Sequence, residues 1–140
     1  MTGITELAAA LGVNGSLTKM SLAWNELGVE GTKAICEALE QNKTLKELDL
    51  CSGNIGVNIG GAAGAKNVAK MLGVNGSLTA LDLSNNYLMD EGVSAVCKAI
   101  QSNKETKLVS LNFKNNHIGP VGANAVAAMV AATGSLTEME

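Results

Sequence analysis

The sequence predicts an α/β solenoid, a short horseshoe with parallel strands on its concave face and helices on its convex face. Two observations predict this fold. A leucine pattern typical of a short strand begins at Leu17, Leu45, Leu78, Leu108 and Leu136. A helical pattern of glycine, alanine and aliphatic residues follows each of the first four strand patterns. One such unit cannot bury its own apolar face, whereas stacked units share a continuous core.

The strand segments follow the pattern L-x-x-L-x-L-x-x-N-x-L, in which the leucines point inward. We expect the asparagines to bond to backbone groups of neighbouring turns, which no sheet ladder reaches. A glycine replaces the asparagine in the second unit, so a local irregularity is expected there. The four segments comprise Leu17, Met20, Leu22, Asn25 and Leu27; Leu45, Leu48, Leu50, Gly53 and Ile55; Leu78, Leu81, Leu83, Asn86 and Leu88; and Leu108, Leu111, Phe113, Asn116 and Ile118.

The helical segments place small and aliphatic residues on one face, through spacings of three and four residues. Leu17 and Leu45 lie 28 residues apart, whereas the next two spacings are 33 and 30. The second unit therefore carries five extra residues, which we expect before its helix, around Val57 to Gly61. We predict a single domain over 1–140, with repeats at about 17–44, 45–77, 78–107 and 108–135 and partial units at 1–16 and 136–140.

Composition narrows the classes of function. The net charge is −3, and all ten basic residues are lysine. Arginine is the usual side chain for two-pronged phosphate recognition, so its absence with an acidic balance argues against binding of nucleic acid. No stretch approaches the roughly 20 apolar residues that cross a membrane, and the start lacks the features of a signal peptide. Three cysteines are consistent with reduced thiols and a cytoplasmic location.

The repeats resemble the ribonuclease-inhibitor-type subfamily of leucine-rich repeat proteins. Asn25-Glu26-Leu27-Gly28 and Asn116-His117-Ile118-Gly119 match the turn of that subfamily, and the helices follow its G-x-x-A-[IVL]-x-x-A-L pattern. The similarity runs from about Ile4 to Glu140 and implies a horseshoe with strands inside and helices outside. The subfamily includes ribonuclease inhibitors, Ran GTPase-activating proteins, tropomodulin-like actin regulators and the sensing arrays of intracellular immune receptors.

The concave face is the first candidate for function, because solenoids present extended surfaces to other proteins. Five acidic residues against two lysines give this face a charge of −3. Trp24, the only tryptophan, falls outside the predicted core, and exposed tryptophans are favoured interface anchors. The alternative is that its ring rests on neighbouring strands. The outward positions are Lys19, Ser21, Ala23 and Trp24; Glu47, Asp49, Cys51 and Ser52; Ala80, Asp82, Ser84 and Asn85; Ser110, Asn112, Lys114 and Asn115; and Glu138 and Glu140.

We therefore predict a non-enzymatic protein–protein interaction scaffold that binds a partner protein through this face. Family analogy offers alternatives: a regulator of a small GTPase or of an actin-type cytoskeletal partner, or a fragment of a larger intracellular leucine-rich repeat receptor. A homodimer through the uncapped ends of the solenoid is a further alternative. The residues expected to bind the partner are Trp24, Asp49, Asp82, Asn85, Asn112 and Lys114.

Other patterns point only weakly to chemistry, and we predict no catalytic residue, cofactor or metal. The glycine-rich segment from Gly56 to Lys66 lacks the lysine and hydroxyl spacing of a phosphate-binding loop. Asp49 and Asp82 should lie on adjacent strands, where paired carboxylates can do acid–base work or hold a cation, but a solvated strip is favoured. His117 has no partner at metal-ligand spacing, and Cys51 has no evident base. Three asparagines match the glycosylation triplet, which carries little weight without a secretion signal: Asn14, Asn42 and Asn75.

Overall fold

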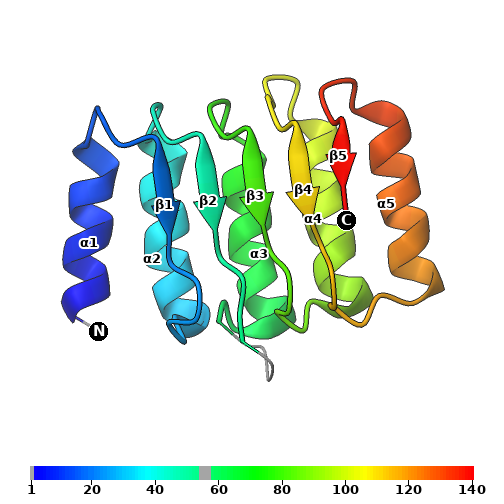
Figure 1. Ribbon diagram of the computed structural model, residues 1–140, viewed down its shortest axis with the longest axis horizontal. Helices are drawn as coiled ribbons and strands as arrows, with labels where there is room; N and C mark the ends of the chain where they lie inside the picture. The colour runs from blue at the N-terminus through cyan, green and yellow to red at the C-terminus, as the bar shows by residue number, and fades with distance from the viewer. Residues whose placement is uncertain (1, 54–57) are drawn as a thin grey trace.

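A computed structural model describes residues 2–53 and 58–140, in which helices and strands alternate along the chain (Figure 1). The helices are α1 (Thr2–Val13), α2 (Gly28–Gln41), α3 (Gly61–Leu72), α4 (Met89–Ser102) and α5 (Pro120–Ala132). The strands are β1 (Lys19–Ser21), β2 (Glu47–Asp49), β3 (Ala80–Asp82), β4 (Ser110–Asn112) and β5 (Glu138–Met139). Ile55, Gly56 and Val57, which enter the sequence predictions above, lie outside the described residues.

The strands form one parallel sheet in sequence order, which confirms the predicted fold class. In Figure 1 the strands make one layer and the helices a second layer behind it, with the chain ends at opposite ends of the array. Parallel strands stack about 4.8 Å apart whereas packed helices need about 8–10 Å, so stacking curves the array with the strands inside. The middle residues of the strands are in register: Met20, Leu48, Leu81, Leu111 and Met139.

The predicted inward leucines form the core. Leu50 and Leu83 have no exposed surface, and Leu22 is 8% exposed. Glycines near the start of the helices let neighbouring helices lie close together. A Cβ at Gly92 would lie 3.1 Å from the Cβ of Ala65 on the preceding helix. Aliphatic and small side chains therefore fill the interior.

Buried asparagines join successive coils, where a coil is one strand and the helix after it. Asn116 accepts, at Oδ1, the backbone N–H groups of Asn86 and Leu88 at 2.8 and 3.2 Å. Its Nδ2 donates to the carbonyl oxygens of Leu83 and Phe113 at 2.9 and 2.8 Å. Asn86 binds the coil before it in the same way. The expected bonding to neighbouring turns is confirmed for Asn86 and Asn116. We call them ladder asparagines, because each bonds to its own coil and to the coil before it.

In the second coil the ladder asparagine is Asn58, and Gly53 is not its equivalent. Asn58 accepts the N–H of Leu27 at Oδ1, at 3.2 Å, and donates from Nδ2 to the carbonyl oxygen of Leu22 at 2.9 Å. In the first coil Asn25 is exposed, and among residues 2–53 and 58–140 its Nδ2 donates only within its own turn, to the carbonyl oxygen of Ala23 at 3.0 Å.

The five-residue insertion lies before the ladder asparagine, so the predicted position around 57–61 is wrong. Asn58 precedes the first close-packed glycine of its helix, Gly64, by six residues. Asn86 and Gly92 have the same spacing. By this alignment the extra residues fall at 53–57 of the sequence, directly before the ladder asparagine.

A second row of asparagines lies at the opposite edge, where each helix turns into the next strand. Asn42 donates from Nδ2 to the carbonyl oxygen of Leu11 at 2.8 Å, and its Oδ1 accepts the N–H of Leu45 at 2.8 Å. Asn75 and Asn103 make equivalent bonds to the preceding helix. Asn42 and Asn75 are 2% and 5% exposed, so their amides are closed to glycosylation.

The cysteines are free thiols: Cys36 and Cys97 are buried and Cys51 is half-buried. Within 2–53 and 58–140, the helices are all too short or too polar to span a lipid bilayer.

Candidate protein-binding surface

The open face of the sheet follows from the alternation of side chains along each strand. The middle residue of a strand points into the core, so the residues on either side face outward. These residues line a shallow depression of about 460 Å³ that crosses the sheet. The polar residues lining it are Lys19, Ser21, Glu47, Asp49, Asp82, Ser110, Asn112 and Glu140.

Two residues assigned to this face from the sequence are not on it. Ser52 and Ser84 are only 8% and 7% exposed. The Ser52 Oγ accepts the N–H of Asn58 at 3.2 Å, and the Ser84 carbonyl accepts the Nδ2 of Asn86 at 3.1 Å. The chain turns inward after each strand to meet the ladder asparagines, so the alternation of faces ends there.

The sheet face is acidic. Lys19 Nζ and Glu47 Oε2 lie 3.3 Å apart in an exposed ion pair between β1 and β2. Asp49 and Asp82 are neighbours in register on β2 and β3. Glu138 extends the acidic character to β5, where its side chain is exposed. The distribution agrees with the excess of acids predicted for this face.

The polar side chains at the ends of the middle strands are fixed by their own backbone. Asp49, Asp82 and Asn112 each accept, at Oδ1, the backbone N–H of the residue two positions later, at 2.9, 2.9 and 2.8 Å. Such side-chain-closed turns are characteristic of aspartate and asparagine. The three side chains therefore keep one orientation in the absence of a partner.

Asp49, Cys51 and Asp82 bring two carboxylates and a thiol within 4.8 Å of one another. Burial, followed by the hydrogen bond and the charge of Asp49, raises the pKa of the Cys51 thiol to about 11. A thiol that stays protonated at neutral pH is a poor nucleophile and a poor metal ligand. The cluster therefore favours attraction of a cationic group over covalent or thiolate–metal chemistry.

Alkylation of Cys51 should be slow and should respond to Asp49. A rise in pKa from 9.0 to about 11 lowers the thiolate fraction at pH 8 by about 100-fold. Asp49→Asn removes a negative charge that raises this pKa and leaves only a neutral, weaker acceptor, so the variant should react faster. Iodoacetamide labelling followed by mass spectrometry across a pH series measures both rates. A wild-type rate equal to that of a free cysteine, or no change in the variant, would contradict the assigned contact.

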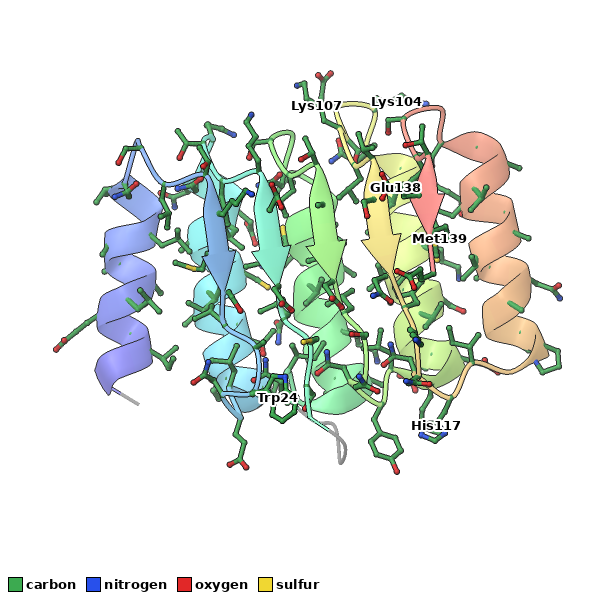
Figure 2. All side chains as sticks on the ribbon, viewed as in Figure 1. Trp24, Lys104, Lys107, His117, Glu138 and Met139 are labelled. Carbon is green, nitrogen blue, oxygen red and sulfur yellow. The ribbon has the colours of Figure 1, made fainter. Side chains whose placement is uncertain are left out.

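Trp24 lies on the turn after β1 and is 70% exposed (Figure 2). Its ring covers Gly53 of the next coil, where a Cβ would lie 3.1 Å from the ring atoms Cε3 and Cζ3. Its backbone N–H donates to the Cys51 carbonyl at 3.0 Å. The ring thus rests on the neighbouring coil while most of the residue stays exposed.

The backbone at Trp24 suits asparagine better than tryptophan. Its φ is +64°, and the equivalent residues Asn85 and Asn115 have φ of +60° and +58°. The repeat therefore imposes a left-handed conformation at this position. Asparagine tolerates that conformation through local hydrogen bonds, whereas it costs other residues about 1–2 kcal/mol. The turn geometry therefore does not explain the choice of tryptophan at this position.

A second exposed row lies on the same edge, one residue after the ladder position. It consists of Glu26, Tyr87 and His117, with φ of +48°, +55° and +55°. The rings of Tyr87 and His117 stack, with centroids 4.6 Å apart and planes 12° from parallel. Figure 2 shows Trp24 and His117 along this one edge of the array. The sequence predictions do not include Tyr87. Its position directly after Asn86 is the feature of the sequence that could have identified it as part of this row.

The predicted binding residues lie in two places: three on adjacent strands and three on the turns that follow the strands. Asp49, Asp82 and Asn112 lie side by side across β2, β3 and β4. Asn85 and Lys114 lie on the turns that follow, and the Asn85 N–H donates to the Lys114 carbonyl at 2.9 Å. The exposed tryptophan belongs to the first turn, so it and Lys114 mark opposite ends of the row.

Comparison with known proteins gives consistent matches. A family model described as Leucine Rich repeat matches residues 13–36, 74–97 and 104–127. Ribonuclease inhibitor of Sus scrofa is 32% identical over 140 residues, which are 99% of this chain and 29% of that protein. NACHT, LRR and PYD domains-containing protein 12 of Mus musculus is 28% identical over 138 residues, which are 96% of this chain and 12% of that protein. This chain thus spans less than a third of the length of either relative.

Two solved structures share the fold. The leiomodin-1 actin-binding site 2 structure has a TM-score of 0.80 and 23% identity, covering 96% of this chain and 76% of that one. The C-terminal domain of Caenorhabditis elegans tropomodulin has a TM-score of 0.78 and 15% identity, covering 97% of this chain and 80% of that one. At these identities the likeness is one of architecture.

Proposed function

This chain belongs to the leucine-rich repeat family, and from that premise we propose that it is a non-enzymatic scaffold that binds another protein through its concave sheet face. The repeats are of the ribonuclease-inhibitor-like kind. We propose that they form a single domain over 1–140. The residues proposed to bind the partner are Trp24, Asp49, Asp82, Asn85, Asn112 and Lys114.

The main support is the row of polar side chains held in place by their own backbone. Asp49, Asp82 and Asn112 are oriented by hydrogen bonds of 2.8–2.9 Å before any partner docks. Immobilising a flexible side chain on binding costs about 0.5–1.5 kcal/mol, and a pre-oriented one avoids most of that cost. A rigid curved sheet with such side chains is suited to recognition.

The proposed partner presents a positively charged surface. Asp49 and Asp82 are half-buried neighbours, and Lys19 is already paired with Glu47. Complementary charge raises the rate of encounter and makes it sensitive to salt. The exposed ring of Trp24, beside these carboxylates, can stack on a lysine or arginine of the partner.

Exchange of the tryptophan and one carboxylate tests the proposal. Trp24→Asn combined with Asp82→Lys should weaken binding to the captured partner by about 100-fold or more, because an aromatic anchor and a charge contact are lost together. The tagged chain captures proteins from the native lysate, mass spectrometry identifies them, and titration with the purified partner gives Kd. Asparagine occupies the equivalent turn position in two other coils, so the fold should persist.

The matched control is Glu37→Lys, which reverses one exposed charge on the convex helix α2. It should leave both capture and thermal unfolding unchanged. Capture that survives the double variant would remove the concave face from consideration.

An actin-type partner is a second candidate, because the leiomodin-1 actin-binding structure superposes over 96% of this chain. Co-sedimentation with filamentous actin tests it directly.

Regulation of a small GTPase is tested by GTP hydrolysis with candidate GTPases. Membership of a larger intracellular receptor is supported by the matches to NACHT-containing proteins, of which this chain spans 12% in the example above.

Two further properties are proposed. The free thiols of Cys36, Cys51 and Cys97 support a reducing compartment, and we place the protein in the cytoplasm. A second copy of this chain is proposed as a further partner, in addition to a different protein.

A further inference from the structure

We propose that the edge of the array where helices turn into strands binds an acidic peptide segment of another protein. The surface lies over three successive turns: 42–46 before β2, 73–79 before β3 and 103–109 before β4. Its charge is opposite to that of the sheet face, so it requires a negatively charged ligand. The inference goes beyond the function proposed above and does not depend on the partner of the sheet face.

The turn before β4 is longer than the two turns that precede it. In the turns before β2 and β3, the first leucine of the strand pattern comes three positions after the asparagine of the second row, whereas Leu108 comes five positions after Asn103. In the shorter turns that asparagine accepts the N–H of the leucine at 2.8 and 2.9 Å. In the longer turn Thr106 Oγ1 accepts the N–H of Leu108 at 3.4 Å instead. The two additional residues therefore fall in this turn.

The longer turn directs Lys107 over the turn before it. The Lys107 Nζ donates to the carbonyl oxygen of Gly76 at 3.1 Å. In the shorter turns the residue directly before the leucine is Thr44 or Ser77, and each donates its hydroxyl to a carbonyl oxygen of the preceding coil at 3.0 and 3.5 Å. These hydroxyls serve the packing of the coils, whereas the ammonium group of Lys107 stays at the surface. Figure 2 shows Lys107 on this edge, with Lys104 of the same turn.

Lys107 lines a hollow of about 390 Å³ together with two other lysines, Lys43 and Lys46 of the turn before β2. All three lysines are exposed. In the part of the chain that the structure describes, ion pairs involve only other lysines, so these three have no carboxylate partner. Glu105 is the acidic residue among the described residues that line the hollow. Three lysines against one glutamate leave the hollow with a charge of +2.

Helix dipoles explain some of the lysines at this edge but not all of them. The carbonyl ends of α2 and α4 lie here, and cations are favoured at such ends. Lys43 and Lys104 directly follow the C-caps of these helices and suit that role. Lys46 and Lys107 lie four residues beyond the C-caps, outside the single turn over which the effect acts. Their charges therefore remain available to a ligand.

The dimensions of the hollow suit a short extended peptide. The turns before β2 and β4 are two strand spacings apart, about 10 Å, which an extended chain covers in about three residues. Two carboxylate side chains at that separation can reach Lys46 and Lys107 at the same time. Val74 also lines the hollow and is 56% exposed, so it offers an apolar contact to a side chain between the two carboxylates.

A long polyanion suits this edge less well than a short peptide. Glu47 directly follows Lys46 and begins the acidic sheet face, so a nucleic acid strand that extended past the hollow would be repelled. The chain also has no arginine, the side chain that holds a phosphate with two hydrogen bonds. A carboxylate-bearing peptide is therefore favoured over nucleic acid.

Fluorescence anisotropy with a short labelled peptide, in which aspartate and valine alternate, measures the binding. The chain should bind this peptide at low ionic strength, and a peptide with asparagine in place of aspartate should not bind. Raising the ionic strength to about 0.3 M should weaken binding by about tenfold or more, because the lysines are exposed and their charges are screened.

Neutralisation of single side chains locates the site. Lys46→Gln and Lys107→Gln should each weaken binding by about fivefold or more, since each removes one charge contact. Lys104→Gln removes the same charge from the same turn, but Lys104 is not among the residues that line the hollow, so its effect should stay below about twofold. Glu105→Gln should strengthen binding, because it removes the negative charge of the hollow. All four side chains are exposed, so thermal unfolding should not change.

Three results would overturn the inference. The absence of binding at low ionic strength would exclude the hollow as a peptide site. Equal losses for Lys104→Gln and Lys107→Gln would indicate diffuse attraction to the edge instead of a site. Displacement of the peptide by an equal concentration of a single-stranded DNA oligonucleotide would assign the surface to nucleic acid. Each result leaves the proposal for the sheet face to be decided by its own variants.

Discussion

Replacing Gly64 with alanine is expected to lower the free energy of unfolding by about 4 kcal/mol or more. A Cβ at this position would overlap the carbonyl oxygen of Ile59. That carbonyl has little freedom to move, because it accepts the Thr32 hydroxyl at 3.1 Å and the N–H of Ile59 is held by Asn86 at 3.2 Å. Since domains are stable by only about 5–15 kcal/mol, much of the variant should be unfolded.

The matched control is Gly3→Ala in α1, where a Cβ would meet nothing within 4 Å. That substitution should stabilise the protein by about 0.5–1 kcal/mol, because alanine loses less conformational entropy in a helix. Urea unfolding followed by circular dichroism measures both variants. A cost below about 1 kcal/mol at Gly64 would show that the turn before α3 can move aside, contrary to the contacts described.

Replacing Asn86 with alanine should cost about 3–4 kcal/mol. Its Nδ2 donates to the carbonyl oxygens of Leu50, Leu83 and Ser84 at 2.9–3.1 Å, and its Oδ1 accepts the N–H of Ile59. Alanine would leave these backbone groups without their side-chain hydrogen-bond partner. Water cannot replace that partner, because Asn86 has no exposed surface. Each buried group that loses its partner costs about 1–3 kcal/mol, less for carbonyls that keep another bond.

Asn25→Ala is the control for the ladder. Asn25 is exposed, and in the described part of the chain its amide bonds only within its own turn, so the loss should stay below about 1 kcal/mol. Denaturant unfolding of the two variants side by side isolates the effect of bridging two coils. Equal losses at both positions would mean that the asparagine acts through its own turn rather than through the ladder.

The fold could be predicted because the repeat period constrains it. Leucines such as Leu50 and Leu83 alternate with polar residues at the spacing of a strand, and the small residues of the helices recur at helical spacing. Only a stack of parallel coils buries both sets at once. The outward positions of Asp49, Asp82 and Asn112 follow from the same alternation, and the exposure of Trp24 agrees with its place in the pattern.

The insertion could not be located from leucine spacing alone, because that spacing gives its length and not its place. The substitution of Gly53 for asparagine drew attention to the wrong residue. The structure shows that the ladder depends on where an amide can reach the previous coil, and Asn58 is the amide that does so. The six-residue interval from Asn58 to Gly64, which recurs in the other coils, would have identified it.

The sequence predicted that Asp49, Asp82 and Asn112 face outward, but it did not predict the hydrogen bonds that hold them. The leucine pattern does not show that Asp49 and Asp82 accept hydrogen bonds from their own backbone. The pattern would be the same if both side chains were free in solvent. The burial of Ser52 arises from a bond to an asparagine six residues later, which no local rule predicts. The stacking of Tyr87 on His117 depends on two coils lying in register at a distance of 30 residues in sequence.

The asparagine ladder runs in one direction, and this has a consequence for biosynthesis. Asn116 completes the turn of the coil before it, by binding the N–H groups of Asn86 and Leu88, rather than the turn of the coil after it. During synthesis on the ribosome, the backbone N–H groups in the turn of a newly emerged coil therefore lack their hydrogen-bond acceptor. They gain it when the asparagine of the next coil has emerged and folded. The nascent chain would mature one coil behind the growing end, with the most recent coil always the least protected.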